Sequence, residues 1–289
     1  IHSFDKLDQT IAKKKLSRSE LSDVDLDIPV RNQNLDAYAL VIGNEDYASY
    51  QNGLSVESNV PFATKDAEVF KNYLINMFQV KEGNVELLIN STYREMNRAF
   101  SRLEKIMEVD GEGKEIIIFY SGHGMPDEEN KDPYLIPVDV SGLNVKDGVS
   151  LKEIMNRLSK KPHKKLTIIT DACFTGAGKK GALASVRGIS IVPNFPEISN
   201  KMVFLASSSG NQSSLTDESR KHGLFTYFML KYLKESSGNI SIDALYKDIK
   251  KSVALEAVKK FNKIQTPDLI LGKDLVPKKD SLEFFMHKE

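Results

Sequence analysis

Short apolar runs alternate with longer amphipathic stretches along most of the chain. Six runs rich in β-branched and aromatic residues have the length of buried strands. They cover residues 37–43, 84–90, 114–121, 164–171, 201–207 and, least regularly, 266–271. Between them, apolar residues recur at helical spacing in five stretches, at about 59–78, 92–108, 150–160, 223–235 and 241–261. This alternation predicts an α/β fold in which a mostly parallel sheet of about six strands is flanked by helices.

Three regions do not follow the alternation. Residues 1–36 are charged and irregular, which predicts a surface extension, with a regulatory pro-segment as the alternative. Residues 125–149 contain a predicted short hairpin around residues 134–137. Residues 176–200 are rich in Gly, Ala, Ser and Lys, and an irregular stretch of this length inside a compact domain is usually functional or mobile.

Composition fits a soluble enzyme. The 289 residues are enough to bury the core of one large α/β domain. Lys plus Arg number 40 and Asp plus Glu also number 40, so net charge gives no argument for nucleic acid or membrane as a partner. No apolar run approaches the roughly 18 residues of a spanning helix, and no signal peptide is recognisable. A single cysteine fits a cytoplasmic protein, although a leader or a larger upstream region before Ile1 is left open.

Two of the predicted strands lead into glycine-containing loops that carry a histidine and a cysteine 50 residues apart. His123 follows one strand within Ser-Gly-His-Gly, and Cys173 follows another within Asp-Ala-Cys-Phe-Thr-Gly. In an α/β sheet, the loops at the carboxyl ends of the strands are where chemistry collects. A lone buried cysteine is more often inert packing. The small neighbours of both residues favour a catalytic pair instead, because a substrate backbone can approach them.

These motifs resemble those of the caspase-like clan of cysteine peptidases, whose signature places a histidine about 50 residues before the cysteine. Three further stretches resemble the same domains. Residues 38–47 are similar to their opening strand and loop, residues 61–67 to the start of their first helix, and residues 223–228 to a helix of their small-subunit region. The resemblance is closer to the bacterial metacaspase and paracaspase branch than to animal caspases.

The resemblance also divides the chain. It implies a caspase-like domain over residues 37–272, which is large-subunit-like to about residue 176 and small-subunit-like from residue 201. Residues 177–200 are then the connecting loop, and residues 273–289 are a C-terminal tail.

By resemblance, the protein is a cysteine endopeptidase that acts on proteins or peptides. A free thiol has a pKa of about 8.5, so little of it is thiolate at neutral pH unless a base takes the proton. Cys173 is the expected nucleophile, and His123 is the expected base that later protonates the leaving amine. The backbone amides of Gly124 and Cys173 are the expected oxyanion hole.

Substrate selection is expected to depend on two acids. Asp171 lies two residues before the candidate nucleophile, and Asp66 lies at the start of the first predicted helix. Animal caspases have a different residue at the first of these positions and select aspartate. Metacaspases and paracaspases carry the acidic pair and select Arg or Lys before the scissile bond, which charge-assisted hydrogen bonds explain. The alternative for Asp66 is that it merely charges a helix N-terminus.

Calcium is expected to be dispensable. Many metacaspases bind it through a cluster of aspartates, and Asp139 matches one member. Val149 and Ser150 stand where an acidic pair is expected, and Lys179 and Lys180 stand where another acid is expected. A hard cation prefers several anionic oxygen ligands, so we expect no metal and no other cofactor. A calcium requirement would need other acids, such as Asp127, Glu128 and Glu129.

The stretch after the cysteine is also a candidate for self-cleavage. Lys179, Lys180 and Arg187 stand there among small residues, where a flexible chain could enter a pocket selective for basic side chains. In caspase-like enzymes this connection is a common site of self-processing. Arg187, followed by Gly188, is the expected position, and a solvated basic loop that is never cut is the alternative.

Two other functions stay open. The first is a catalytically silent caspase-like scaffold that only binds partners, against which the intact Cys-His pair argues. The second is a different hydrolase or transferase that uses a thiol on an α/β sheet, because fold analogy alone does not fix the reaction. The sequence identifies neither the substrate protein nor an activating partner or upstream region.

Overall fold

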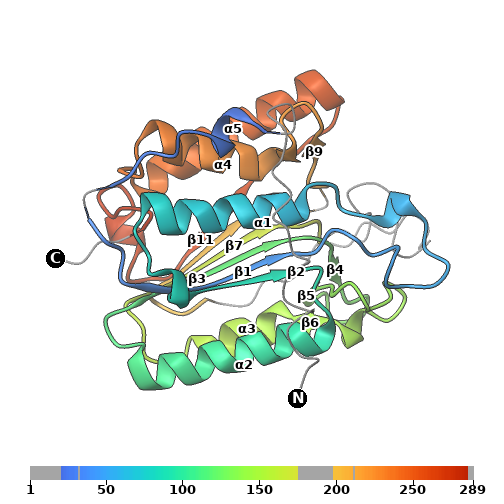
Figure 1. Ribbon diagram of the computed structural model, residues 1–289, viewed down its shortest axis with the longest axis horizontal. Helices are drawn as coiled ribbons and strands as arrows, with labels where there is room; N and C mark the ends of the chain where they lie inside the picture. Colours follow the sequence, from blue (N-terminus) through green and yellow to red (C-terminus); the bar gives the residue numbers. More distant parts are fainter. Residues whose placement is uncertain (1–20, 32, 175–197, 211, 286–289) are drawn as a thin grey trace, which may run out of the picture.

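A six-stranded sheet lies at the centre of the computed structural model, which describes residues 21–31, 33–174, 198–210 and 212–285 (Figure 1). The strand order is β11-β8-β7-β3-β1-β2. All neighbours pair in parallel except β11, which is antiparallel to β8. The strands are β1 Ala37–Gly43, β2 Val85–Ile89, β3 Glu115–Ser121, β7 Lys165–Asp171, β8 Met202–Ala206 and β11 Asp268–Leu271. The predicted α/β fold with a mostly parallel sheet of six strands is confirmed.

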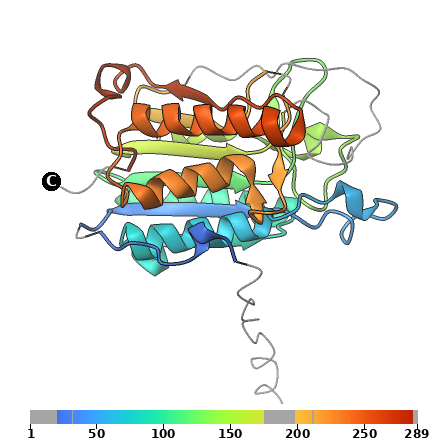
Figure 2. The same cartoon turned by 90° about the horizontal axis from the view of Figure 1, so that it is seen from above.

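Five helices cover the two faces of this sheet. Figure 1 shows α1, α4 and α5 on one face and α2 and α3 on the other, and Figure 2 shows the first three lying side by side. Their bounds are α1 Ala63–Asn72, α2 Tyr93–Asp110, α3 Leu151–Leu158, α4 Leu224–Glu235 and α5 Ile242–Phe261. Among the described residues, none of the helices is long and apolar enough to cross a membrane.

The first helix differs in detail from its prediction. It begins four residues later than predicted, because Phe62 adopts a positive φ of 70° and ends the preceding turn. After Asn72 the chain continues as a π-helical turn at Tyr73–Met77. α1 approaches β1 closely, since a Cβ on Gly43 would lie 2.5 Å from the carbonyl oxygen of Ala63.

The central strands are apolar because helices cover them on both sides. All seven residues of β3 and all seven of β7 are buried, so both faces of these strands select Ile, Leu, Phe and Tyr. Their first residues form an ion pair, with Lys165 Nζ 3.2 Å from Glu115 Oε1. Their last residues, Ser121 and Asp171, lie opposite each other at the carboxyl edge.

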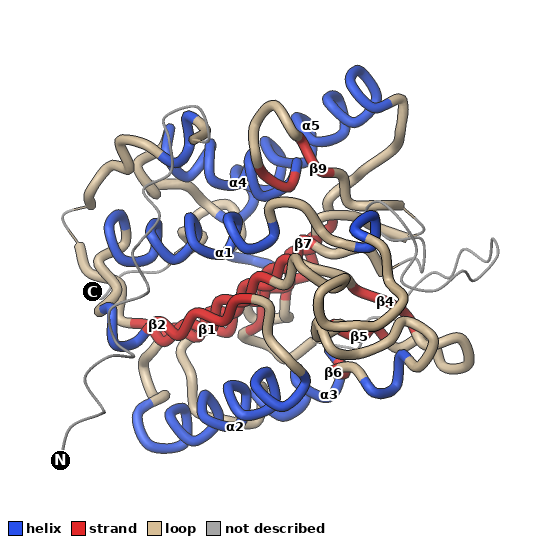
Figure 3. Tube along the Cα trace, turned by 45° about the vertical axis from the view of Figure 1, so that its right-hand side comes forward, coloured by secondary structure: helices blue, strands red, loops and turns tan. Residues whose placement is uncertain are grey.

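A small antiparallel sheet lies beside that carboxyl edge (Figure 3). It contains β4 Gly124–Pro126, β5 Pro133–Leu135 and β6 Val149–Ser150. β4 and β5 form a hairpin, and β6 adds a third strand. The hairpin was predicted around residues 134–137, but its turn lies earlier, and Tyr134 and Leu135 belong to its second strand. Because β4 begins one residue after His123, the hairpin fixes the chain that leaves the candidate histidine.

The described parts of the two end segments pack into the core. Val24 and Leu35, from the predicted extension, are buried in the cluster that joins α1, α4 and α5 to the sheet. Phe284 and Phe285, from the predicted tail, are buried in the same cluster, with ring centroids 4.7 Å apart. The carbonyl oxygen of Phe284 also accepts a hydrogen bond from Lys165 Nζ. Residues 21–36 and 273–285 therefore contribute to the packed structure, with Asn32 outside the described residues.

Candidate active site

The loops that carry His123 and Cys173 are neighbours at the carboxyl edge of the sheet. β3 and β7 pair in parallel up to Ser121 opposite Asp171, and each candidate residue lies two positions beyond that pair. The loops also touch, because a Cβ on Gly124 would come within 2.6 Å of the Phe174 ring. Only a glycine fits this contact without a shift, so the residue after the histidine packs directly on the residue after the cysteine.

Two buried tyrosines fix the backbone of His123. Its N–H donates to the hydroxyl of Tyr47 at 2.9 Å, and its carbonyl oxygen accepts from the hydroxyl of Tyr120 at 2.6 Å. The Tyr47 ring also lies against the imidazole, with centroids 4.6 Å apart. Desolvation raises the pKa of both tyrosines, so both stay protonated.

A backbone carbonyl fixes the tautomer of His123. Nε2 lies 2.7 Å from the carbonyl oxygen of Ser58. A carbonyl oxygen only accepts, so Nε2 carries the proton and the neutral ring has its lone pair on Nδ1. A histidine in this tautomer can receive a proton at Nδ1 while Ser58 holds the ring in place.

The thiol of Cys173 is covered in this conformation. The side chain is 1% exposed, and Sγ accepts a hydrogen bond from the backbone N–H of Ser214 at 2.7 Å. The carbonyl oxygen of Ser214 lies 3.6 Å from the same sulfur. The backbone of Ser214 therefore lies against the sulfur in this conformation.

The two candidate specificity acids come together at Gly223. A Cβ on this glycine would lie 2.2 Å from Asp171 Oδ2 and 3.0 Å from Asp66 Oδ2. Gly223 belongs to β10 His222–Gly223, which pairs with β9 Thr216–Asp217. Both carboxylates are fully buried. The acids, which are 105 positions apart in the chain, therefore lie beside the same buried glycine.

Asp171 is surrounded by hydroxyl and amide donors. Oδ1 accepts from Ser214 Oγ at 2.5 Å, and Oδ2 accepts from Thr226 Oγ1 at 2.7 Å and from the Thr226 amide at 3.3 Å. Ser214 thus contacts both the thiol of Cys173 and the carboxylate of Asp171. Ser214 therefore links the candidate nucleophile to one of the candidate specificity acids.

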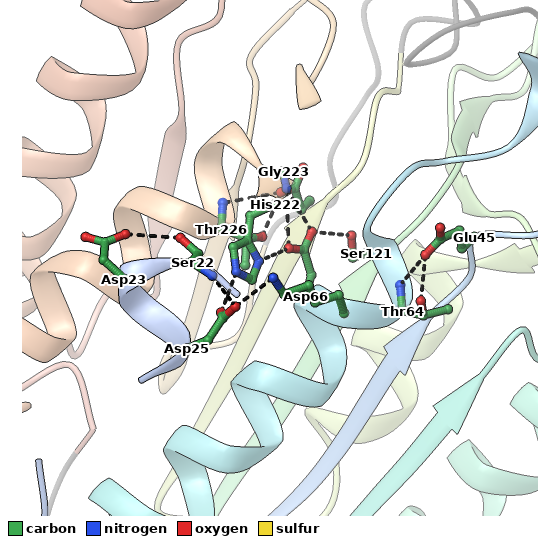
Figure 4. A network of polar contacts seen from close by, with 12 residues as sticks. Ser22, Asp23, Asp25, Glu45, Thr64, Asp66, Ser121, His222, Gly223 and Thr226 are labelled. Atoms are coloured by element: carbon green, nitrogen blue, oxygen red, sulfur yellow. Dashed lines mark hydrogen bonds and ion pairs between the residues drawn. The ribbon is translucent and has the colours of Figure 1, made fainter. Parts of the chain in front are cut away.

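Asp66 is linked to a histidine that the sequence did not indicate. Its Oδ1 lies 2.7 Å from His222 Nδ1, and its Oδ2 accepts from Ser121 Oγ at 3.1 Å (Figure 4). His222 Nε2 lies 2.7 Å from Asp25 Oδ1. The second oxygen of Asp66 thus faces Ser121 and Gly223. The only sequence signal for His222 was its place directly before the stretch 223–228.

The contacts of His222 and Asp25 shift the pKa of each group in the direction that favours its charged form. Burial alone would lower the pKa of His222, but hydrogen bonds to Asp25 and Asp66 outweigh it and hold the pKa above its ordinary value. Burial raises the pKa of Asp25, and hydrogen bonds to His222 and Lys65 more than offset this, so its pKa lies below the usual range.

A sequence model of the caspase domain matches residues 36–273, which is most of the chain. The chain belongs to the caspase-domain family. Among solved structures, protein GSU0716 from Geobacter sulfurreducens has a TM-score of 0.61 at 17% identity, covering 88% of this chain and 100% of that one. Caspase-1 from Spodoptera frugiperda has a TM-score of 0.57 at 15% identity, covering 87% and 94%. At these identities the structures show the shared fold alone. A search of curated protein sequences found no match.

The acids considered for calcium have structural partners in this caspase domain. Asp139 Oδ1 accepts from the amide of Tyr93 at the start of α2, at 2.8 Å. Asp127 Oδ1 accepts from the amides of Glu129 and Asn130. In the part of the chain that the structure describes, no group of three or more His, Cys, Asp or Glu side chains is arranged to hold a metal ion. Lys179, Lys180 and Arg187 lie outside the described residues.

Replacing Tyr47 with phenylalanine tests how the histidine is positioned. The substitution leaves the buried N–H of His123 without its hydroxyl acceptor, which typically costs about 1–3 kcal/mol of unfolding free energy. We expect peptidase activity to fall as well, because this hydroxyl holds the backbone of His123, while phenylalanine keeps the ring contact with the imidazole. Denaturant unfolding and peptide hydrolysis of Tyr47→Phe measure the two effects. Tyr38→Phe is the control, since its hydroxyl donates to Asp110 at the end of α2, away from the candidate site. Equal activity loss in both variants would contradict the positioning role.

Proposed function

We propose that this caspase domain is a cysteine endopeptidase that cleaves protein substrates after Arg or Lys. The observation that carries the proposal is the contact between the His123 and Cys173 loops at the ends of two paired parallel strands. The carbonyl of Ser58 supports it further, because it leaves the lone pair of the imidazole on Nδ1.

The chemistry assigns one role to each group. His123 takes the proton of Cys173, and the thiolate attacks the carbonyl carbon of the scissile bond. The amides of Gly124 and Cys173 stabilise the oxyanion that forms. The C–N bond then breaks, and His123 donates its proton to the leaving amine. Water, deprotonated by His123, hydrolyses the thioester and restores the thiol.

The two buried acids support selection of a basic side chain. The carboxylates of Asp66 and Asp171 both lie beside Gly223. A substrate ammonium or guanidinium would form charge-assisted hydrogen bonds with them. On Asp171, such a cation would replace the neutral hydroxyl of Ser214. Substrate binding and uncovering of Cys173 are then one event, because the same serine contacts both.

A panel of fluorogenic peptides tests this function. The peptides differ only in the residue before the scissile bond, which is Arg, Lys, Asp or Leu. We expect hydrolysis after Arg and Lys and little after Asp or Leu. Hydrolysis of none of the four, by protein whose fold is verified, would favour a silent scaffold instead. The buried thiol of Cys173 is the observation that favours this alternative, because a buried thiol does not react with a substrate.

Self-cleavage is a further part of the proposal. Arg187, followed by Gly188, is the expected cut, because glycine after the cut leaves the backbone accessible. We expect intact-mass measurement of wild type to reveal two fragments that Cys173→Ala lacks, and Arg187→Ala to abolish or move the cut. Fragments in equal amount in wild type and Cys173→Ala would indicate an outside protease, and the absence of fragments from both would remove the idea.

Calcium should have little effect on the rate. Asp127 and Asp139 are already occupied by amide donors, and Lys146 lies 3.6 Å from Asp127. We therefore expect kcat/KM for an arginine peptide to be the same in EGTA as in millimolar calcium. A saturable calcium dependence would contradict this, and Asp127→Asn and Asp139→Asn would then locate the ligands.

A further inference from the structure

A buried chain of charged groups connects the N-terminal segment to the candidate specificity pocket. It runs from Asp25, in the short helical turn Asp23–Asp25, through His222 in β10 to Asp66 in α1 (Figure 4). Each of the two contacts to the imidazole is 2.7 Å long. Three segments that are far apart in the sequence therefore meet at one histidine.

The imidazole must carry a positive charge to satisfy both neighbours. A carboxylate only accepts hydrogen bonds, so a ring held between two carboxylates has to donate from both nitrogens. Asp66 also accepts from the amide of Gly223 and from Ser121, which fits an ionised carboxylate. Asp25 in turn lies 2.6 Å from Lys65 Nζ. Cations and carboxylates therefore alternate along the chain of contacts.

This arrangement fixes the direction of the Asp66 carboxylate. His222 holds Oδ1, so Oδ2 turns toward Ser121 and Gly223, which is the side on which Asp171 lies. Without the imidazole, the carboxylate could rotate away from the pocket. A cation that binds both acids needs Asp66 in this orientation, because charge-assisted hydrogen bonds depend on geometry.

The N-terminal segment is built to hold Asp25 in place. Lys234 of α4 donates to the carbonyl oxygens of Asp23 and Leu26, on both sides of Asp25, at 2.7 Å each. Asp25 Oδ2 also accepts from the amide of Ser22 at 2.7 Å. Asp25 is thus anchored from both directions along the chain, and its second oxygen is free to hold the histidine.

We propose that Asp25 and His222 are positioning residues for Asp66, and that residues 21–31 thereby form part of the site that selects basic side chains. The inference rests on the proposed function. A buried set of charges stabilises a fold little compared with apolar residues of the same size. We therefore assign the buried charges of Asp25 and His222 a role in orienting the carboxylate of Asp66. The segment supports substrate binding and does not block it.

The test compares two substrates that differ only in charge. One peptide has arginine before the scissile bond, and the other has citrulline, which is neutral and nearly the same shape. The variants are Asp25→Asn and His222→Gln, which keep size and some hydrogen bonding. Asp36→Asn is the control, because it removes a carboxylate directly before β1 that pairs with Lys114 and not with the histidine.

We expect the preference for arginine over citrulline to fall roughly tenfold or more in both variants. Loss of a residue that orients a ligand-binding side chain commonly has an effect of this size. The change should be in KM for the arginine peptide, with kcat and the citrulline reaction nearly unchanged. The rate at which iodoacetamide alkylates Cys173 should stay at the wild-type value, and Asp36→Asn should behave as wild type.

The outcomes separate this inference from the proposed function. Wild type that cleaves neither peptide overturns the proposed function and this inference with it. Wild type that prefers arginine, with Asp25→Asn keeping that preference, overturns the inference alone. A loss confined to kcat, equal for both peptides, would mean a structural role and would also overturn it. Asp25→Asn decides the matter should His222→Gln fail to fold.

Discussion

Cys173→Ala is expected to abolish peptide hydrolysis and leave the caspase domain folded. Only one buried sulfur is lost, and it accepts a hydrogen bond from the backbone N–H of Ser214, which leaves the side chain of that residue in place. His123→Ala is expected to lower kcat by roughly 10²–10⁴, the usual contribution of a positioned acid and base. Steady-state hydrolysis of an arginine peptide measures both losses, and circular dichroism and thermal unfolding measure the fold.

His163→Ala is the matched control for the histidine. His163 is also buried, and its Nδ1 lies 2.7 Å from a backbone carbonyl, but it precedes β7 at the opposite edge of the sheet. It should retain wild-type kcat. Substantial turnover by Cys173→Ala would show that another group is the nucleophile. A His123→Ala rate within a few fold of wild type would remove the histidine from the mechanism.

Asp171→Asn is expected to have the next largest effect, confined to basic substrates. Removing one partner from a buried, hydrogen-bonded charge pair costs about 2–5 kcal/mol, which corresponds to roughly 30- to 5000-fold in kcat/KM. Asparagine keeps the size of the side chain and can still accept from Ser214 or Thr226. We therefore expect a large loss for arginine and lysine peptides and a small change in unfolding free energy.

Asp217→Asn is the control for this prediction. Its carboxylate is as buried as that of Asp171 but pairs with Arg220 and Lys260 of the chain itself. Burial raises the pKa of Asp217, but hydrogen bonds to Lys260 and Ser219 more than offset this effect and lower the pKa to about 2. The ionised Asp217 therefore adds to the unfolding free energy above about pH 4, and this contribution is lost as the pH falls through about 2. At neutral pH, Asp217→Asn should lose stability and keep its preference for basic residues. An equal preference for basic residues in wild type and Asp171→Asn would contradict the role of Asp171 in substrate selection.

The sheet was predictable because its strands are buried on both faces. β3 carries the apolar run Ile116–Tyr120, and β7 carries Leu166, Ile168 and Ile169 among buried threonines; fully buried strands of this kind leave little choice of structure. The helices were predictable from their apolar stripes, although the start of α1 was not, because it depends on the positive φ of Phe62. The first 36 residues were predicted as an extension because they are charged and irregular, and residues 273–289 as a tail because the resemblance ends before them. Val24 and Phe285 are nevertheless buried through contacts with distant residues.

The candidate site could be predicted only where a motif carries it. His123 and Cys173 stand in recognisable loops, and the parallel pairing of their strands brings the loops together. Ser58 acts through its backbone carbonyl, which every residue has, so no sequence pattern indicates it. Asp25 and His222 meet across 197 positions, and their pairing depends on how α4 and the N-terminal segment pack.

The central claim is that Cys173 is a nucleophile in a site selective for basic side chains. The most direct measurement is the rate and position of labelling by a peptidyl chloromethyl ketone that ends in arginine, against the same reagent ending in aspartate. The account predicts one adduct per chain, located at Cys173 by peptide mapping, formed much faster with the arginine reagent and absent from Cys173→Ala. Labelling at another residue, or equal rates with the two reagents, would contradict it.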